Sequence, residues 1–417
     1  MGRLTGARAQ RSKFVAKTGR IEGRADLLPN YRPGDGFFFE HPRGAVVTWG
    51  IARSIAVSAG PGQVAAAAAL AEAALSEIEV ADGSPRPVVV GALPFDGASP
   101  ATLVVPRIAW VRSPDGTAWR ICVGREGEPD WAEPEPTDHL HREAATELDV
   151  APLPAPGAYV EAVHEARRRI RRGDLDKVVL ARMLVVRAGH EFDRVSLLER
   201  LRLTEPDAFV FAANGFLGAT PELLVAREGR TVRANPLAGT TPRGPDSPSD
   251  RAAAEALLGS AKELHEHDLV VEAVRTGLAE ACDQLDIDPY PSPMATGRLW
   301  HLSTEVRGTL TEPAPNALAL AALLHPTPAV CGTPRDAAVA AIRDLERIDR
   351  ALYAGLVGWM NADGDGEWAI ALRCAEIQGQ LALLFAGAGI VGDSDPQAEL
   401  AETDAKFRAM LDALGWA

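Results

Sequence analysis

The end of the sequence carries three charged side chains that a helix would place on one face. Glu399, Glu402 and Lys406 occupy positions i, i+3 and i+7, shortly after Pro396, a residue type that often begins a helix. Two carboxylates at this spacing can bind a hard divalent cation, and a lysine one turn further can bind an anionic oxygen. The alternative is a solvated helix surface with a Glu402–Lys406 ion pair, which the composition of the triplet alone favours.

A glycine run in front of this expected helix favours a ligand site. An apolar strand of residues 383–386 ends at Gly387, Ala388 and Gly389. Glycine has no side chain, so backbone N–H groups in this run can approach a ligand closely. The strand end and the acidic helix together predict that an anion and a metal ion bind near each other.

A second acidic pair lies upstream on a long expected helix, residues 252–282, which is interrupted at most once. Glu263 and Glu266 are three positions apart and share one face of this helix. Oxygen donors without nearby cysteine favour magnesium. His265 and His267 are therefore expected to pack beside the site or to support its ligands rather than to bind zinc.

Three other charged residues stand among apolar neighbours. Lys177 begins a β-branched strand, residues 176–182, where an exposed edge position is the usual alternative. Glu222 stands between a proline and three aliphatic residues. Burial would raise its pKa and make it a candidate general acid, unless it lies on an exposed turn. Arg373 lies in an expected strand, residues 367–377, and its planar guanidinium would suit a substrate carboxylate.

The elements that must position these residues follow from periodicity and turn residues. Residues 27–150 alternate in the manner of strands around one alanine-rich helix, residues 63–78, and form a variable first part. Residues 134–156 are rich in proline and acid and are expected to connect this part to a catalytic region, residues 155–417. Further helices are expected at residues 159–172 and 343–353.

The first 26 residues are expected to stand apart from the fold. They are basic and lack a periodic pattern, and residues 21–24 spell IEGR, a protease-cleavage site often placed after expression tags. A transit segment is the alternative, but it would be amphipathic. We therefore expect a disordered segment or an expression tag.

Length and composition limit the classes of function. A chain of 417 residues with 47% hydrophobic and 24% charged residues is typical of a globular protein with one or two domains. The 43 basic and 57 acidic residues give a net charge of −14, which argues against a nucleic-acid or membrane-surface partner. An anionic small substrate would need a local cationic pocket or a metal.

The cysteines and the hydropathy pattern bear on the compartment. The 4 cysteines lie far apart without the spacing of a metal site or a disulfide framework, so we expect them to be reduced. No run of 18 apolar residues is present in the sequence. These features predict a cytoplasmic protein; the sequence leaves its oligomeric state open, with a monomer as the working expectation.

From about residue 159 to the end, the chain resembles the chorismate-utilising enzymes. This family comprises isochorismate synthases, salicylate synthases and the large subunits of anthranilate and aminodeoxychorismate synthases. Each motif is weak alone, but their common order is highly specific. Besides residues 383–407, they are DKVVLAR, GATPELLV, NPLAGTTPRG, KELHEHDLVVEAV, LWHLSTEVRG, LHPTPAVCGTP, LYAGLVGW and IALRCAEI. The resemblance implies the α+β fold of anthranilate synthase component I, with large antiparallel sheets packed as a sandwich and helices outside.

The resemblance also implies roles for individual residues. Lys177 corresponds to the general base that activates water, and Glu222 to the general acid that protonates the leaving hydroxyl. The metal ligands for Mg²⁺ are implied to be Glu266 and Glu402, assisted by Glu263 and Glu399. The substrate-binding residues implied by the family are His301, Ala329, Tyr353, Arg373, Gly387, Ala388, Gly389 and Lys406.

Two alanines indicate the branch of the family. Ala238 stands where aminodeoxychorismate synthases have a lysine nucleophile, and Ala329 stands where the pyruvate-releasing branches typically have threonine or serine. The resemblance therefore implies an isochorismate synthase, an isomerase that uses water and needs no glutamine amidotransferase subunit. The alternatives are a salicylate synthase and an aminating, amidotransferase-coupled subunit. The sequence does not indicate whether isochorismate would serve siderophore, menaquinone or salicylate biosynthesis.

Overall fold

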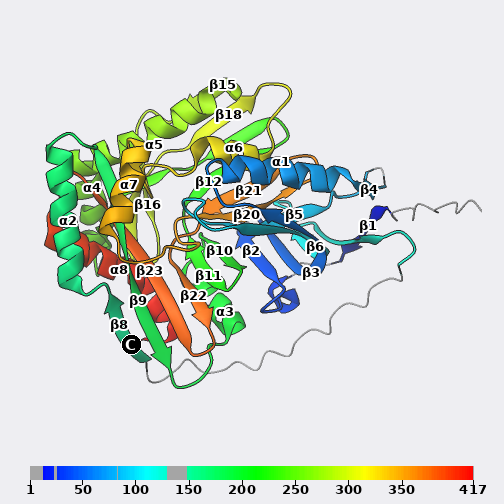
Figure 1. The fold of residues 1–417 in the computed structure, drawn as a ribbon, viewed down its shortest axis with the longest axis horizontal. Helices are drawn as coiled ribbons and strands as arrows, with labels where there is room; N and C mark the ends of the chain where they lie inside the picture. The colour runs from blue at the N-terminus through cyan, green and yellow to red at the C-terminus, as the bar shows by residue number, and fades with distance from the viewer. Residues whose placement is uncertain (1–12, 23–25, 82, 129–147, 417) are drawn as a thin grey trace, which may run out of the picture.

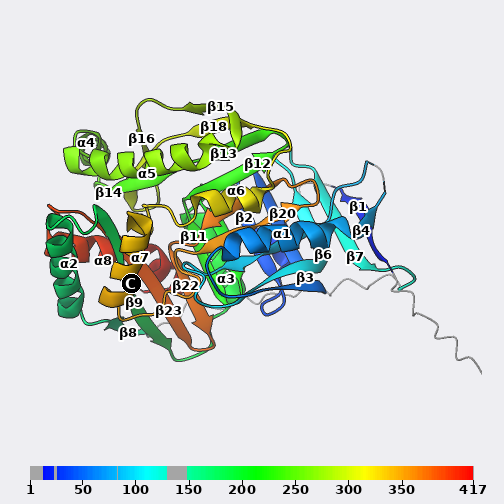
Figure 2. The same cartoon turned by 45° about the horizontal axis from the view of Figure 1, so that its top comes forward.

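The computed structural model describes residues 13–22, 26–81, 83–128 and 148–416. In this part of the chain, one 20-stranded sheet and one 3-stranded sheet form the framework, and helices cover the outside of the strands (Figures 1 and 2). Apart from a parallel contact between β1 (Phe14–Ile21) and β4 (Ile78–Val80), the described strands pair in antiparallel fashion. The expected α+β fold with large antiparallel sheets packed as a sandwich is confirmed.

The strands and helices are distributed along the whole described chain. The remaining strands of the first part are β2 (Phe37–His41), β3 (Gly44–Val57), β5 (Val88–Leu93), β6 (Ala101–Arg112), β7 (Ala118–Arg125) and β8 (Leu148–Leu153). The later strands are β9 (Lys177–Ala188), β10 (Phe209–Ala213), β11 (Phe216–Thr220), β12 (Leu223–Glu228), β13 (Thr231–Ala234), β14 (Leu237–Pro242), β15 (Cys282–Ile287), β16 (Ser292–Ala295), β17 (Leu299–Ser303), β18 (Val306–Leu310), β19 (Gly332–Thr333), β20 (Leu356–Asn361), β21 (Gly366–Ile370), β22 (Cys374–Gln378) and β23 (Leu381–Ile390). The helices are the 3-10 turn Leu28–Asn30 and α1 (Gln63–Ser76), α2 (Pro156–Arg171), α3 (Arg194–Thr204), α4 (Ser247–Leu258), α5 (Ala261–Ala279), α6 (Ala317–Leu324), α7 (Arg335–Leu345) and α8 (Pro396–Leu414).

The large sheet has two halves joined by the long strands β3 and β6, which pair with each other along most of their length. One half runs from β8 and β9 through β23, β22, β11, β10 and β2 to β3. The other runs from β6 through β5, β20, β21, β12, β13 and β18 to β15. The chain therefore crosses between the halves where β11 leads into β12 and where β21 leads into β22.

The helices that carry the acidic pairs begin at well-formed caps. Ser260 accepts a hydrogen bond from the backbone N–H of Glu263 at the start of α5, and Asp395 accepts hydrogen bonds from the first turn of α8. Such caps satisfy backbone donors that a helix start otherwise leaves free. The expected single interruption is confirmed, because α4 ends at Leu258 and α5 begins at Ala261, but α5 ends at Ala279 and Cys282 begins β15. Figure 2 shows α4 and α5 in succession beside β14.

Two clusters of buried apolar residues hold the helices on the sheet. The larger cluster joins α1 and α6, which lie side by side in Figure 1, to the strands of the second half, and it includes the fully buried Trp368. The smaller cluster joins Phe407 and Met410 of α8 to Leu384 of β23. Burying one large apolar side chain contributes about 1.5–3 kcal/mol, so these contacts fix α8 against the strand that carries the glycine run.

Two expectations for the first part of the chain need correction. Residues 14–21, expected to be structureless, form β1, which pairs with β7 along its length and with β4. Main-chain pairing with existing edge strands orders this segment without any helical or strongly apolar pattern. The rest of the expected tag, residues 1–12 and 23–25, lies outside the described residues. The expected connector ends in β8, which pairs with β9; its residues 134–147 also lie outside them.

Three element boundaries in the catalytic region also differ from expectation. The helix expected at residues 343–353 ends at Leu345, because Glu346 is already extended. The strand expected at residues 367–377 is divided into β21 and β22 at Arg373, which has a φ of +46°. The strand expected to stop before Gly387 continues to Ile390, because β9 pairs with it up to Val178. Tertiary pairing, not local propensity, sets these boundaries.

The length and hydropathy of the described helices and the state of the four cysteines test two expectations from the sequence. Among the described helices, none combines the length and apolar character that crossing a membrane requires. Cys122, Cys282, Cys331 and Cys374 are all free thiols, as expected, and the last two are buried.

Candidate active site

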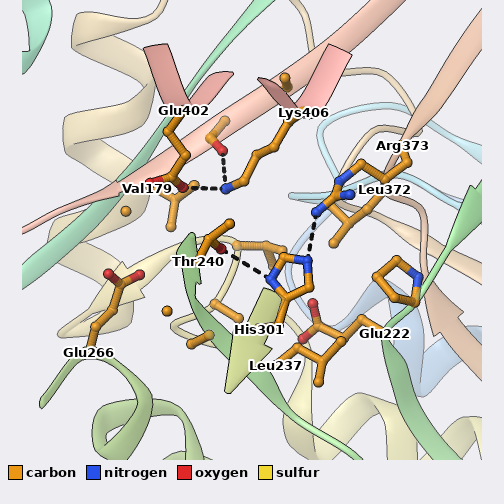
Figure 3. A pocket seen from close by; sticks show the side chains of 18 of the residues that line it. Val179, Glu222, Leu237, Thr240, Glu266, His301, Leu372, Arg373, Glu402 and Lys406 are labelled. Atoms are coloured by element: carbon orange, nitrogen blue, oxygen red, sulfur yellow. Dashed lines mark hydrogen bonds and ion pairs between the residues drawn. The ribbon is translucent and has the colours of Figure 1, made fainter. Parts of the chain in front are cut away.

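A pocket lies where strands β9, β14, β17 and β23 meet helices α5 and α8 (Figure 3). The β11–β12 link and the β21–β22 link, at which the chain crosses between the sheet halves, also reach it, as does the loop before β19. Charged side chains from α5, α8 and the two links therefore face one space. In Figure 3, Glu222 lies close to His301 and Arg373, while Glu266 lies on the other side of the view.

The two crossing links place Glu222 and Arg373 beside each other in the fold. Glu222 follows β11, and Arg373 precedes β22, which is the pairing partner of β11. Hydrogen bonds tie the links to the neighbouring strands: the Ile370 N–H donates to the Glu222 carbonyl (3.1 Å), and the Ala219 N–H donates to the Arg373 carbonyl (3.2 Å). Backbone pairing therefore fixes both side chains at the pocket wall.

Glu222 is buried, not exposed on a turn. Its side chain is 3% exposed and lines the pocket. Burial raises the pKa of Glu222 to about 8, although Lys177, Lys406 and Arg373 each favour the charged form. At neutral pH this carboxyl group holds its proton. Glu222 thus has the protonation state that a general acid needs.

A hydrogen-bonded chain connects Arg373, His301 and Thr240. The Arg373 guanidinium donates to Nε2 of His301 (3.1 Å), and Nδ1 of His301 lies 3.1 Å from Oγ1 of Thr240. Because a guanidinium can only donate, Nε2 must be an acceptor, and the imidazole proton is on Nδ1. Burial, together with the positive charges of Arg373 and Lys406, holds the pKa of His301 well below its ordinary value. The ring is therefore neutral and orients Arg373.

Arg373 is the strongest candidate for binding an anionic group of a substrate. Burial lowers the pKa of its guanidinium, and Glu205 opposes this effect. Among the described residues, no carboxylate forms an ion pair with Arg373. A partly buried cation without an ion-pair partner that faces a pocket favours an anionic ligand there.

The glycines of β23 are needed for close packing at the pocket. A Cβ atom at Gly389 would lie 2.2 Å from Oε1 of Glu266 and 3.0 Å from Cε of Lys177. A Cβ atom at Gly387 would lie 3.1 Å from the Tyr353 hydroxyl oxygen. Any larger residue at position 389 would therefore displace the Glu266 carboxylate.

Lys177 and Glu266 form a buried ion pair. The Lys177 ammonium lies 2.7 Å from Oε1 of Glu266, and the Lys177 side chain is 0% exposed. This burial excludes the alternative of an exposed edge-strand lysine. Burial would raise the pKa of Glu266, but the charge and hydrogen bond of Lys177 outweigh burial and lower it. Glu266 lines the pocket, whereas Lys177 does not form part of its wall.

Lys406 and Glu402 form a second ion pair at the pocket. The Lys406 ammonium lies 2.6 Å from Oε1 of Glu402 and donates to the carbonyl of Gly387 (2.8 Å), contacts drawn in Figure 3. The pair expected for a solvated helix surface is therefore present. It is largely buried, with 16% of the Lys406 side chain and 22% of the Glu402 side chain exposed.

The outer members of the two acidic pairs share one lysine. Lys262 lies 3.3 Å from Oε1 of Glu263 and 3.1 Å from Oε1 of Glu399. Burial raises the pKa of Glu263, and the nearby charges of Glu266 and Glu402 raise it further, against the opposing effect of Lys262. Burial also raises the pKa of Glu399. The four carboxylates are thus close enough to repel one another.

The carboxylates do not form a closed metal cage. Within the described residues, no group of three or more His, Cys, Asp or Glu side chains converges as a metal site does. Magnesium, however, is commonly held by one or two carboxylates, with substrate and water supplying the remaining ligands. Glu266 and Glu402 both line the pocket and offer oxygen donors, so the residues present fit a magnesium site completed by a substrate.

Buried residues in the segment after α7 hold the part of the pocket wall that Val179 and Val330 form. The Arg350 guanidinium donates to the carbonyls of Val330 and Val179, at 2.8 Å each, and pairs with Glu346. Val330 and Val179 both line the pocket. The loop that carries Ala329 and the strand that carries Lys177 are therefore connected through one arginine.

Most of the residues expected from the sequence meet in this pocket. The predicted residues that line it are Glu222, Glu266, His301, Ala329, Tyr353, Arg373, Gly387, Gly389, Glu402 and Lys406. Lys177, Ala388, Glu263 and Glu399 lie outside its lining. His267 is fully buried and contacts Thr304 (2.7 Å). This contact fits the expected packing role of His267. His265, for which the same was expected, is instead exposed, because it lies on the outer face of α5.

Sequence reasoning missed Thr240 and Lys262 as functional candidates. Thr240 contacts His301, and its backbone N–H donates to Oε2 of Glu263 (3.1 Å). The bulge in β14 at Gly239, with a φ of +72°, brings this N–H to the α5 helix. The glycine within the NPLAGTTPRG turn was the available signal for Thr240. The only sequence feature that could have indicated Lys262 was its position next to Glu263.

Comparisons with known proteins identify a family and relatives that match nearly the whole chain. Residues 27–415 match the family described as chorismate binding enzyme. The chain is 39% identical over 402 residues to the isochorismate synthase DhbC of Bacillus subtilis (strain 168), a match covering 93% of this chain and 96% of the relative. It is also similar to the solved structure of MenF, the menaquinone-specific isochorismate synthase from Escherichia coli. The TM-score is 0.81 at 25% identity, over 97% of this chain and 95% of that chain.

A more distant solved structure shares the fold. Anthranilate synthase component I from Streptococcus pneumoniae TIGR4 matches with a TM-score of 0.70, over 88% of this chain and 92% of that chain. At 22% identity, this likeness concerns the fold alone.

Proposed function

The chain belongs to the family of chorismate-binding enzymes, and we propose that it is the isochorismate synthase that its nearly full-length similarity to DhbC indicates. The reaction adds water at C2 of chorismate and expels the C4 hydroxyl group, so it is an isomerisation. The similarity to DhbC over 93% of the chain is the observation that carries this proposal. The pocket chemistry described above supports it.

Glu222 is proposed as the general acid. Expelling a hydroxyl group requires a proton on the departing oxygen, and Glu222 keeps its proton at neutral pH because burial raises its pKa to about 8. It lines the pocket beside Arg373 and His301, and its link between β11 and β12 is held by backbone pairing.

Lys177 is proposed as the general base that activates water. A lysine accepts a proton only as a neutral amine, so base catalysis requires Lys177 to leave its ion pair with Glu266. Cε of Lys177 packs close to Gly389, where a Cβ would come within 3.0 Å of it. Glu266 thus connects the proposed base to the pocket.

The substrate carboxylates are proposed to bind at opposite parts of the pocket. Chorismate is a dicarboxylate, and a protein with a net charge of −14 needs local cations to hold it. Arg373 and Lys406 would bind one carboxylate, assisted by Tyr353 and the backbone near Gly387. Neutral His301 orients Arg373 for this contact.

Magnesium is proposed as the cofactor, held directly by Glu266 and Glu402. When bound, it would neutralise the ring carboxylate of the substrate and orient the ring. Glu263 and Glu399 lie on the same two helices and would act indirectly, because neither lines the pocket and both pair with Lys262. The metal ligands themselves would come from both α5 and α8, so metal binding also depends on the packing of these helices.

Water, and not ammonia, is the proposed nucleophile, and isochorismate the released product. Ala238 and Ala329 line the pocket without a lysine amine or a hydroxyl group. The relatives DhbC and MenF carry the name isochorismate synthase, and MenF is described as menaquinone-specific.

Product analysis tests this proposal. Chorismate and magnesium should give a mixture of chorismate and isochorismate by chromatography, without pyruvate in a lactate dehydrogenase assay and without a change on adding ammonia. Stoichiometric pyruvate release would replace the proposal with a salicylate synthase. Ammonia-dependent amination would replace it with an amidotransferase-coupled subunit.

A further inference from the structure

Lys262 joins the two helices that carry the acidic pairs. It precedes Glu263 on α5, and its ammonium lies 3.3 Å from Oε1 of Glu263 and 3.1 Å from Oε1 of Glu399 on α8. Because the two carboxylates belong to different helices, a single cation connects α5 to α8 at the outer end of the acidic cluster.

Both carboxylates at this lysine are fixed in position. Oε2 of Glu263 accepts the Thr240 N–H (3.1 Å), and the Glu399 side chain is only 2% exposed. A charged carboxylate is costly to bury unless a cation accompanies it. Lys262 is the cation that contacts both carboxylates. Its ion pairs therefore differ from exposed ion pairs, which contribute little to the stability of a protein.

Lys262 also sets the net charge of the acidic cluster, on which its affinity for a metal ion depends. Its four carboxylates, Glu263, Glu266, Glu399 and Glu402, are paired with three lysines, which leaves a net charge of −1. Without Lys262 the net charge would be −2. The affinity of an oxygen site for a divalent cation depends on the number of charges around it, so the count predicts a change in metal binding.

We propose that Lys262 is a positioning residue that acts as a tethered cation: it holds Glu263 and Glu399 in ion pairs and so reserves the divalent metal for Glu266 and Glu402. This inference rests on the proposed magnesium site. Lys262 thereby maintains the spacing of α5 and α8 before metal binds, and it weakens the attraction of the whole cluster for a cation. The enzyme would therefore bind the divalent metal less tightly but at one defined position.

Mn²⁺ titration of the metal-free, substrate-free protein tests the proposal, with free Mn²⁺ measured by electron paramagnetic resonance. Lys262→Met, which keeps the apolar stem, should bind Mn²⁺ about tenfold more tightly than the wild type. Its metal-free form should melt at a lower temperature, and Mn²⁺ should raise that temperature by more than in the wild type. Lys262→Arg keeps the charge and should bind Mn²⁺ as the wild type does.

Arg275→Met is the matched control, because it removes one positive charge from the exposed face of the same helix, where Arg275 pairs with Glu272. Equal or weaker Mn²⁺ binding by Lys262→Met, relative to this control, would overturn the role of Lys262. If Lys262→Arg gained as much Mn²⁺ affinity as Lys262→Met, the gain would result from altered packing and not from the lost charge. That result would also overturn the proposed role of Lys262. Absence of Mn²⁺ binding by the wild type would overturn the magnesium site together with this inference, whereas isochorismate formation by the same preparation tests the activity separately.

Discussion

Replacing Glu222 with glutamine removes its ionisable proton and keeps the size of the side chain. Glu222 is 3% exposed, and burial raises its pKa from 4.5 to about 8. The folded protein therefore binds this proton more tightly than the unfolded chain does. Stability is unaffected by Glu222 below pH 4.5, falls as the pH rises from 4.5 to about 8, and is constant above that.

The shift gives the size of the effect. One pKa unit corresponds to about 1.36 kcal/mol. Ionisation of Glu222 should therefore lower the free energy of unfolding of the wild type by at most about 2.7 kcal/mol between pH 5.5 and pH 7.5. Glutamine has no proton to lose and carries no such cost. The stability difference between Glu222→Gln and the wild type should therefore grow over this interval in favour of the variant.

Urea denaturation of both proteins at pH 5.5 and 7.5 measures this difference, and Glu255→Gln, at an exposed position on α4, is the control. The same variant should lose about 10²–10⁴-fold in the rate of isochorismate formation, because glutamine cannot donate the proton. In the wild type, activity should decline above about pH 8 as Glu222 ionises. A stability difference independent of pH, together with full activity of the variant, would refute both the burial argument and the acid assignment.

Three further predictions concern the opposite side of the pocket. Lys177→Ala should lose about 10²–10⁴-fold in the rate of isochorismate formation, whereas unaltered turnover would show that the Lys177–Glu266 ion pair is only structural. Glu266→Gln and Glu402→Gln should each remove most activity and weaken Mn²⁺ binding while circular dichroism stays that of the wild type; full activity of wild-type enzyme in excess EDTA would contradict the metal assignment. Gly389→Ala should reduce activity and Mn²⁺ affinity, because its Cβ would lie 2.2 Å from the Glu266 carboxylate. Gly392→Ala, just after β23, controls for the general effect of a glycine substitution in this region, because its Cβ would meet only Ile170, at 3.7 Å.

Residue types and order allowed the sequence to predict the fold and most of the site. The helical spacing of Glu399, Glu402 and Lys406 predicted a common face, and α8 has it. Apolar neighbours predicted the burial of Glu222, which is confirmed. These predictions depended on local periodicity and on hydrophobic context, both of which are properties of a short stretch of chain.

Only the tertiary structure decided which charges distant in the sequence are paired and where the strands end. Lys177 and Glu266 are far apart in the sequence, and their ion pair exists because β9 and α5 meet at Gly389. The division of one expected strand at Arg373 likewise follows from the crossing between sheet halves. Long-range pairing and burial fix these features, and neither leaves a periodic signal near the residues concerned. The sequence by itself therefore determined which side chains are available for the chemistry, and the packing of distant elements determined their partners and their protonation.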